Sequence, residues 1–268
     1  MKTILLHIYE DDALESRFSA ALDLARAFSS HITCLHATPL EDYLAHDPLI
    51  AAELPEEFSE KMKKRRLALQ SRVEERLRSE GVGWDWIHEN DLLWTSLVRH
   101  SALADVVVLS LAGTAFMKRD PRPLAARVAT HSRTPVLGIP PGVHRFDAEA
   151  PAIVAWNGSA EAAAAVKGAI PLLKRASRVQ LLEIEERRAA YPKDRLARYL
   201  ARLDVHVEIL DRPRDRRVSE IIHDAARDAG AGLIVMGAYG HSRLQELLLG
   251  GVTRNLVVDS EVPLLLAH

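Results

Sequence analysis

The sequence predicts an α/β protein made of two doubly wound domains in tandem, each a parallel sheet covered by helices. Three observations support this: strand-like apolar runs alternate with segments of helical periodicity, the order of these segments occurs twice, and 268 residues suit two domains of roughly 150 residues. We expect domains at residues 1–140 and 151–268, joined by a turn at 140–142 and a polar linker.

The first half is expected to contain five strands and four helices. Leu14, Phe18 and Leu22 recur at helical spacing after the first β-rich run, and the same alternation continues along this half. The expected strands are residues 2–9, 31–37, 82–88, 105–110 and 135–139. The expected helices are residues 13–29, 92–103 and 123–130, with a longer helical segment inside a polar insert at 40–80. Acidic residues surround the basic run in this insert, which favours a solvated helix face over a nucleic-acid surface.

The second half repeats this order. The expected strands are residues 152–156, 179–184, 205–210, 232–236 and 263–267, and the expected helices are 160–174, 194–203, 218–229 and about 252–258. Three segment pairs match directly: 3–8 with 152–157, 104–110 with 231–237, and 134–137 with 262–265. We interpret the chain as a duplicated unit whose first copy carries the longer insert.

Composition narrows the class of protein. Hydrophobic residues make up 48% and charged residues 27%, and the formal net charge is -2, which gives no general attraction to nucleic acid. No apolar run approaches the roughly 18 residues of a membrane span, and there is no signal-peptide pattern. The single cysteine, Cys34, lies in an apolar run and is predicted to be a buried structural thiol. These features favour a cytoplasmic protein without membrane contact.

A glycine-rich stretch at residues 237–253 carries the strongest functional signal. It follows an apolar strand, has Gly237 and Gly240 at its start, and enters a helix through Gly250 and Gly251. Glycines let backbone N–H groups approach a phosphate, and a helix start supplies unpaired donors. Asn157, in the turn after the first strand of this half, is expected to face the same crevice, since ligands bind beyond the carboxyl ends of such strands.

With these motifs the chain resembles the universal stress protein family, in particular its tandem two-domain members. The ATP-binding members carry Gly-x2-Gly-x9-Gly followed by Ser or Thr, and the resemblance implies a strand order of 3-2-1-4-5 in each domain. It places Asn157 at the adenine edge, and Ile184 and Met236 along the base. It assigns the phosphates and ribose to Gly237, Gly240, Gly250, Gly251, Val252 and Thr253.

This chain departs from the family pattern at two positions. Gly251 stands where ATP binders have Ser or Thr, which removes a hydroxyl donor. Asn157 replaces an aspartate, although an amide can still donate and accept hydrogen bonds. The remaining donors are the backbone at residues 250–253 and the hydroxyl of Thr253.

The first half retains little of the glycine pattern. Only Gly113 is kept, while Pro123, Leu124 and Ala126 fall near the positions of the later glycines and the threonine. Proline has no N–H to offer a phosphate. We therefore expect no nucleotide to bind the first domain through this site.

The function predicted from the sequence is a stress-response protein that binds or senses an adenine nucleotide through its second domain. ATP is the expected ligand, with Mg²⁺ accompanying its phosphates, and turnover is expected to be slow or absent. No catalytic residue is assigned. A metal centre is not predicted either: His88, Glu89 and Asp91 lack a metal-binding spacing, and a helix N-cap at Asn90 or Asp91 is favoured instead.

Two other classes of function remain open. One is a nucleotide-independent scaffold or interaction protein in which the glycine site is vestigial, and the weaker one is a small-molecule or metal-dependent hydrolase. The family resemblance also implies that the last strands, 135–139 and 263–267, pair across a pseudo-twofold axis within the chain, which would cover exposed strand edges. The sequence is compatible with both a monomer and a homodimer.

Overall fold

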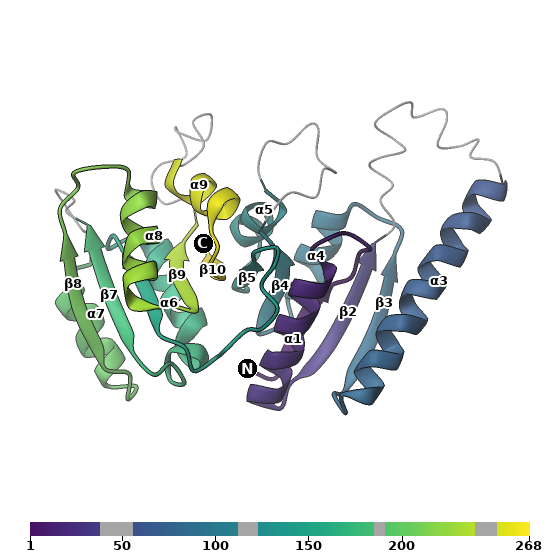
Figure 1. Cartoon of the computed structure of the whole chain (residues 1–268), viewed down its shortest axis with the longest axis horizontal. Helices are drawn as coiled ribbons and strands as arrows, with labels where there is room; N and C mark the ends of the chain where they lie inside the picture. The colour runs from purple at the N-terminus through teal and green to yellow at the C-terminus, as the bar shows by residue number, and fades with distance from the viewer. Residues whose placement is uncertain (38–55, 112–122, 185–190, 239–250) are drawn as a thin grey trace.

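The computed structural model describes residues 1–37, 56–111, 123–184, 191–238 and 251–268. Ten strands form one sheet in the order β3-β2-β1-β4-β5-β10-β9-β6-β7-β8. The strands are β1 (Thr3–His7), β2 (His31–Ala37), β3 (Trp84–Glu89), β4 (Val106–Ser110), β5 (Val136–Ile139), β6 (Ala152–Trp156), β7 (Val179–Ile184), β8 (Val207–Arg212), β9 (Leu233–Gly237) and β10 (Leu264–Ala267). In Figure 1 the two halves lie side by side, with β5 and β10 at the centre.

The predicted strand order is confirmed in both halves. β1 to β5 are arranged 3-2-1-4-5, and β6 to β10 repeat that arrangement from the opposite edge of the sheet. Strands within each half are parallel, whereas β5 and β10 pair antiparallel, with Leu265 opposite Leu137. The expected pairing of the two last strands is therefore present within the chain. It covers one edge of each half-sheet, and β3 and β8 remain as the outer edges.

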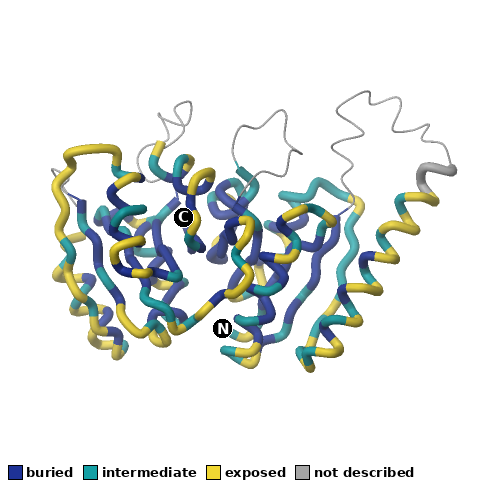
Figure 2. Tube along the Cα trace, viewed as in Figure 1, coloured by how far each residue is buried: buried dark blue, intermediate teal, exposed yellow. Residues whose placement is uncertain are grey.

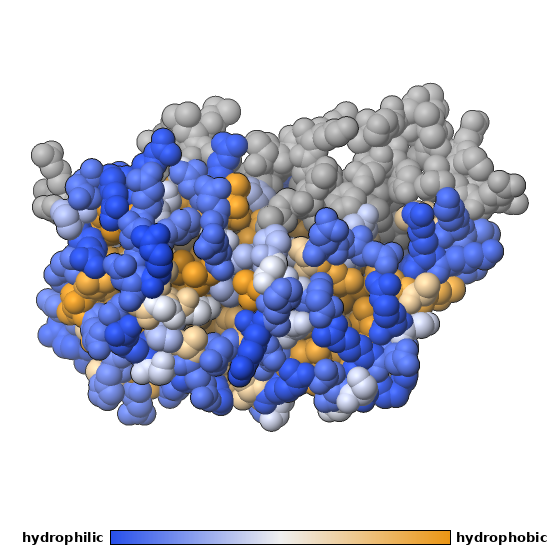
Figure 3. Space-filling view, viewed as in Figure 1, coloured by the Kyte–Doolittle hydropathy of each residue, from blue (hydrophilic) through white to orange (hydrophobic). Residues whose placement is uncertain are grey.

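Helices cover both faces of the sheet, as a parallel sheet requires. They are α1 (Leu14–Phe28), α3 (Glu56–Ser79), α4 (Leu93–Ser101), α5 (Leu124–His131), α6 (Ala160–Leu173), α7 (Lys193–Ala201), α8 (Val218–Ala229) and α9 (Gly251–Asp259). One buried cluster packs α1, α3, α6 and α7 on one face, and a second packs α4, α5, α8 and α9 on the other. Figure 2 shows the inner strands as the most deeply buried part, whereas the outer strands β3 and β8 are half-buried to exposed. Hydrophilic residues cover most of the described surface on the face seen in Figure 3.

Local sequence signals explain several helix boundaries. The Oγ atom of Ser159 accepts a hydrogen bond from the backbone N–H of Ala162 at 3.1 Å, which caps the start of α6. Gly230 ends α8 in the left-handed conformation, with φ at +60°, which glycine adopts without strain. The expected cap at Asn90 or Asp91 is wrong: Leu92 is the N-cap of α4, and the carboxylate of Asp91 accepts from the Leu92 N–H at 2.7 Å.

The match between the two first strands is shifted by one residue from the sequence alignment. In the sheet, Ile4 lies opposite Val106 and Ala152 lies opposite Leu233. Val106 and Leu233 are the equivalent first residues of β4 and β9. The counterpart of Ala152 is therefore Ile4, whereas the sequence alignment pairs Ala152 with Thr3. Both strands begin with an apolar run, so the sequence pattern alone could not fix the register.

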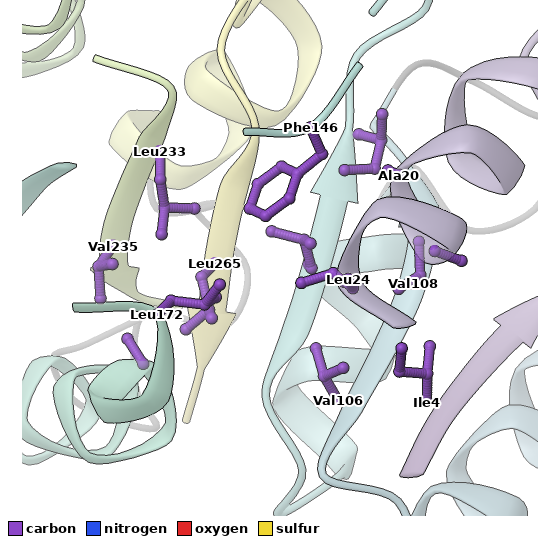
Figure 4. Close-up of a cluster of buried hydrophobic side chains, with 14 of the residues drawn as sticks. Ile4, Ala20, Leu24, Val106, Val108, Phe146, Leu172, Leu233, Val235 and Leu265 are labelled. Atoms are coloured by element: carbon purple, nitrogen blue, oxygen red, sulfur yellow. The ribbon is translucent and has the colours of Figure 1, made fainter. Parts of the chain in front are cut away.

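The segment between the halves is packed against the first half. Phe146 is 3% exposed, and its backbone N–H donates to Asp23 of α1 at 2.9 Å. Figure 4 shows its ring between Leu265 of β10 and the α1 residues Ala20 and Leu24. The polar linker expected here therefore contributes an apolar anchor where the two halves meet.

The long helix α3 lies within the helical segment expected at residues 40–80 and packs one face on the sheet. Leu69, Val73 and Leu77 are buried in the cluster that contains Cys34. Burial raises the pKa of the Cys34 thiol to about 12, with the carboxylates of Glu74 and Asp85 adding to the effect. Cys34 is thus a structural thiol, as predicted. No helix in the described part of the chain is long and apolar enough to span a membrane.

Candidate functional site

Three of the predicted site residues lie at the carboxyl ends of neighbouring strands in the second half. Ile184 ends β7, Met236 is the penultimate residue of β9, and Asn157 directly follows β6. Ala155 on β6 pairs with Met236, and Ala155, Ile184 and Met236 belong to the core facing α8 and α9. Because side chains alternate along a strand, Asn157 leaves β6 on the same face as Ala155. We call Ala155, Asn157, Ile184 and Met236 the second-half crevice.

Asn157 is held by a tight turn at the end of β6. Its Oδ1 atom accepts from the backbone N–H of Ser159 at 3.1 Å, and Gly158 between them has φ at +71°. This turn positions Ser159 as the cap of α6. Within the described residues, the amide nitrogen of Asn157 makes no hydrogen bond to the protein, and its side chain is half-buried. The amide is therefore oriented and retains donors for a ligand.

Gly237 has a structural role that the sequence pattern did not reveal. A Cβ atom added to Gly237 would lie 2.5 Å from the backbone nitrogen of Ala162 and 2.7 Å from the carbonyl carbon of Glu161. The end of β9 consequently lies directly against the first turn of α6. Glycine at this position lets the strand and the helix approach closely, which fixes the shape of the turn that holds Asn157.

The start of α9 lies at the same end of the sheet as the crevice. α9 leads into β10, which runs parallel to β9, so the helix begins beyond the carboxyl end of β9. Among the described residues, no atom would lie within 4 Å of a Cβ atom added to Gly251. Val252 packs on the α8 and α9 core, and Thr253 is 5% exposed. Gly240 and Gly250 lie outside the described residues.

The corresponding positions of the first half carry larger side chains. By sheet register, His7 occupies the position of Ala155, and Tyr9 that of Asn157. His7 is 2% exposed, and its ring stacks on that of Tyr9 with centroids 6.2 Å apart and an interplanar angle of 11°. A methyl group and an amide in one half are thus replaced by two stacked rings in the other.

A buried arginine closes the turn beyond β1. Arg17 of α1 has no exposed surface, and its guanidinium donates to Asp11 at 2.6 Å and to Ser110 at 3.0 Å. It also donates to the backbone carbonyls of His7, at 2.8 Å, and Tyr9. Burial lowers the pKa of Arg17, and the bond to Asp11 opposes that shift. This network was not found from the sequence, because a single arginine at helical spacing resembles a solvated residue.

On the opposite face of the second half, a lysine is paired with two carboxylates. The ammonium group of Lys193, at the start of α7, pairs with Glu183 at 3.0 Å and with Asp211. Hydrogen bonds from Asp211 and Glu183 raise the pKa of Lys193. By contrast, the second-half crevice contains no charged side chain among its four residues.

Comparison with known proteins agrees with this architecture. Residues 151–268 match the model of the universal stress protein family. A universal stress protein of Methanocaldococcus jannaschii is 44% identical over 46 residues, which is 17% of this chain and 28% of that protein. The chain therefore spans well under two thirds of the length of this curated relative.

Solved structures extend the similarity to the whole chain. A universal stress protein from Archaeoglobus fulgidus has a TM-score of 0.77 at 14% identity, covering 99% of this chain and 97% of that one. A putative universal stress protein from Pseudomonas aeruginosa has a TM-score of 0.59 at 16% identity, covering 99% and 92%. At such identities these matches establish the fold.

The sheet order and its two helical layers define a doubly wound α/β protein. The second half of the chain belongs to the universal stress protein family, and the layout of the whole chain fits two such domains in tandem. The expected domain limits, 1–140 and 151–268, remain a prediction for the first half.

Proposed function

We propose that the protein binds an adenine nucleotide, ATP, through its second domain and turns it over slowly or not at all. The observation that carries this proposal is the difference between the two crevices. In the second half Ala155 and Asn157 are half-buried at the end of β6, whereas in the first half the equivalent His7 is buried and stacked on Tyr9. The second half thus carries the smaller side chains at these positions, which supports a ligand site there rather than in the first half.

The residues present suit a purine base. Ala155 and Met236 are paired on adjacent strands, and Ile184 adds a third apolar surface on the same face. A flat aromatic ring gains from burial on such a surface. The oriented amide of Asn157 would bind the polar edge of the base, since it offers donors and a carbonyl oxygen.

The start of α9 suits the phosphates. Residues 251–253 lie in the first turn of the helix, whose backbone N–H groups have no partner within the helix. Such donors, with the helix dipole, favour an anion. Gly251 itself is exposed, and no described residue would crowd a side chain at this position. Mg²⁺ bound with ATP would balance the charge of the phosphates.

The proposed lack of turnover follows from the same residues. All four side chains of the second-half crevice are uncharged, so this described part of the site supplies neither a general base nor a cation for the transferred phosphoryl group. We infer that the nucleotide acts as a ligand that changes contacts with a partner, and no partner is specified by the site.

The experiment is mass spectrometry of ligand released from the purified protein, combined with an ATP titration of the wild type and of Gly240→Val. A released adenine nucleotide, with affinity lost in the variant, supports the proposal. Absence of measurable ATP binding to the wild type contradicts it and favours the nucleotide-independent scaffold.

A further inference from the structure

A second group of polar side chains lies in the first half, on the face of α1 and α3. His36 and His88 are register partners near the carboxyl ends of β2 and β3, and their rings lie with centroids 5.6 Å apart at 37°. The ring of Trp86 stacks on His36 at 6.3 Å and 19°. These residues lie away from the crevice occupied by His7 and Tyr9.

Two buried polar atoms in this group have no protein partner. The Nδ1 atom of His36 and the Nε1 atom of Trp86 are both inaccessible to solvent, and neither makes a hydrogen bond in the described structure. His36 is only 7% exposed. Buried polar groups are normally paired, because leaving one unpaired costs free energy, so a ligand or water is expected to satisfy them. The indole N–H can only donate, which indicates a partner that accepts hydrogen bonds.

The surrounding charge is positive. α3 packs on this face, and its half-buried Arg66 acts on both imidazoles. Burial, followed by the charges of His88 and Arg66, lowers the pKa of His36 to about 4. Burial and Arg66 lower the pKa of His88 as well. The carboxylate of Glu89 on β3 is bound by two other side chains, His100 at 2.6 Å and Arg99 at 2.9 Å.

The second half shows how the same positions can be neutralised. By sheet register, Glu183 corresponds to His36, and Asp211 corresponds to His88. There Lys193 of α7 lies between the two carboxylates and pairs with both. In the first half the two carboxylates are replaced by imidazoles while the helix above still supplies a cation. At these two register positions the described part of the first half therefore carries imidazoles where the second half carries carboxylates.

We propose that His36, Trp86, His88 and Arg66 form a binding site for a small tetrahedral oxyanion in the first half of the chain. Phosphate, sulfate or the phosphoryl end of a phosphomonoester shares this chemistry: negative charge and several acceptor oxygens. Arg66 supplies a permanent charge, and the unpartnered nitrogen atoms of Trp86 and His36 supply donors once His36 holds a proton on Nδ1.

Anion binding at this site is coupled to proton uptake. An anion favours the charged imidazole, so it raises the pKa of His36 from its low value in the free protein. Among the described residues, His7, His88 and Arg66 oppose protonation of His36, whereas its own backbone favours protonation. Affinity should rise as the pH falls, by up to about tenfold per pH unit for the uptake of one proton.

Sulfate is the suitable probe, because it keeps the same charge between pH 5.5 and about 7.5. Sulfate is titrated into the full-length protein with labelled histidines while the His36 and His88 ring resonances are followed by NMR. Arg66→Gln is the test variant, and Arg65→Gln is its matched control, since it removes the same charge from the exposed neighbouring position of α3. Glycerol phosphate is titrated in parallel to distinguish a phosphomonoester from an inorganic anion.

The proposal predicts saturable shifts of the His36 and His88 ring resonances and tighter sulfate binding at pH 5.5 than at pH 7.5. Sulfate affinity should fall about tenfold or more in Arg66→Gln and stay unchanged in Arg65→Gln. Tighter binding of glycerol phosphate than of sulfate would assign the site to a phosphomonoester, and the reverse to an inorganic anion. Unchanged His36 resonances in sulfate, or equal weakening by the two arginine variants, would overturn it. The outcome is independent of ATP binding in the second half.

Discussion

Gly237 and Ala162 approach so closely that a Cβ atom on the glycine would lie 2.5 Å from the backbone nitrogen of the alanine. This contact joins the end of β9 to the first turn of α6. Both elements border the second-half crevice, since Asn157 begins the turn that leads into α6. The glycine that opens the Gly-x2-Gly pattern is therefore required by the packing of the fold, whatever ligand is bound.

The first prediction concerns this contact. Gly237→Ala should lower the free energy of unfolding by about 1–3 kcal/mol, because the neighbouring atoms are backbone and cannot move aside as a flexible side chain would. Gly251→Ala is the matched control: it has open space at the start of α9, and alanine should leave stability unchanged or raise it by up to about 1 kcal/mol. Urea denaturation measures both variants, and equal stability of the two would contradict the packing argument.

The second prediction concerns the missing hydroxyl at the start of α9. Gly251→Ser places a hydroxyl donor where the ATP-binding family members have one, and the space for it is open. ATP affinity should increase by about three- to tenfold, the effect of one net hydrogen bond. Gly251→Ala, which adds the carbon atom alone, should bind ATP as the wild type does. If both variants bind equally, the phosphates do not contact this position.

The third prediction concerns the buried network of Arg17. Arg17→Met should lower the free energy of unfolding by about 3–5 kcal/mol, because it removes the buried cation that pairs with the Asp11 carboxylate and donates to two backbone carbonyls. Arg72→Met removes a pair with Glu10 whose side chains are 61% and 58% exposed, and should cost under about 1 kcal/mol. Chemical denaturation near pH 7 compares the two. A similar small loss in both variants would show that the Arg17 network contributes little.

The fourth prediction concerns pH. Burial, and then the charges of Arg17 and His36, hold the pKa of His7 well below 6.5, so the folded protein keeps this imidazole neutral. The unfolded chain takes up the proton below about pH 6.5. The neutral His7 imidazole therefore makes its full contribution to the free energy of unfolding above that pH. This contribution is lost as the pH falls toward the folded-state pKa, at up to about 1.4 kcal/mol per pH unit.

His36 adds a similar loss between pH 6.5 and its folded-state pKa of about 4. His7→Leu should therefore reduce the slope of unfolding free energy against pH by about one proton, whereas His206→Leu, at an exposed position, should leave it unchanged. Urea titrations at several pH values from 7.5 to 4.5 give the slopes. A slope in His7→Leu as steep as that of the wild type would show that His7 is not held neutral.

Periodicity was sufficient to predict the fold. The alternation of apolar runs and helical spacing reflects burial on two faces, so it located the strands and described helices to within about two residues. It could not fix the register of β1, because a slip of one residue exchanges apolar residues for apolar residues. The cap at Leu92 and the anchoring role of Phe146 also depended on contacts between distant segments, which local patterns do not contain.

The candidate site was only partly predictable. Asn157, Ile184 and Met236 meet at one edge because they follow strand ends, and strand ends can be read from the sequence. The placement of His7 and Tyr9 at the equivalent first-half positions could not be predicted from the sequence. It depends on the exact strand register and on a ring contact that residue spacing does not encode. The sequence identified the loss of glycines in the first half, and the structure adds that larger side chains, His7 and Tyr9, stand at the positions of Ala155 and Asn157.

The most direct test is an isothermal titration with ATP of the wild type and of a variant whose second crevice copies the first. Ala155→His and Asn157→Tyr together place there the two rings that the first half accommodates. The proposed function predicts one ATP per chain for the wild type and no measurable binding for the double variant, with circular dichroism confirming that it remains folded. Two equivalent sites per chain, or undiminished binding to the folded double variant, would contradict it.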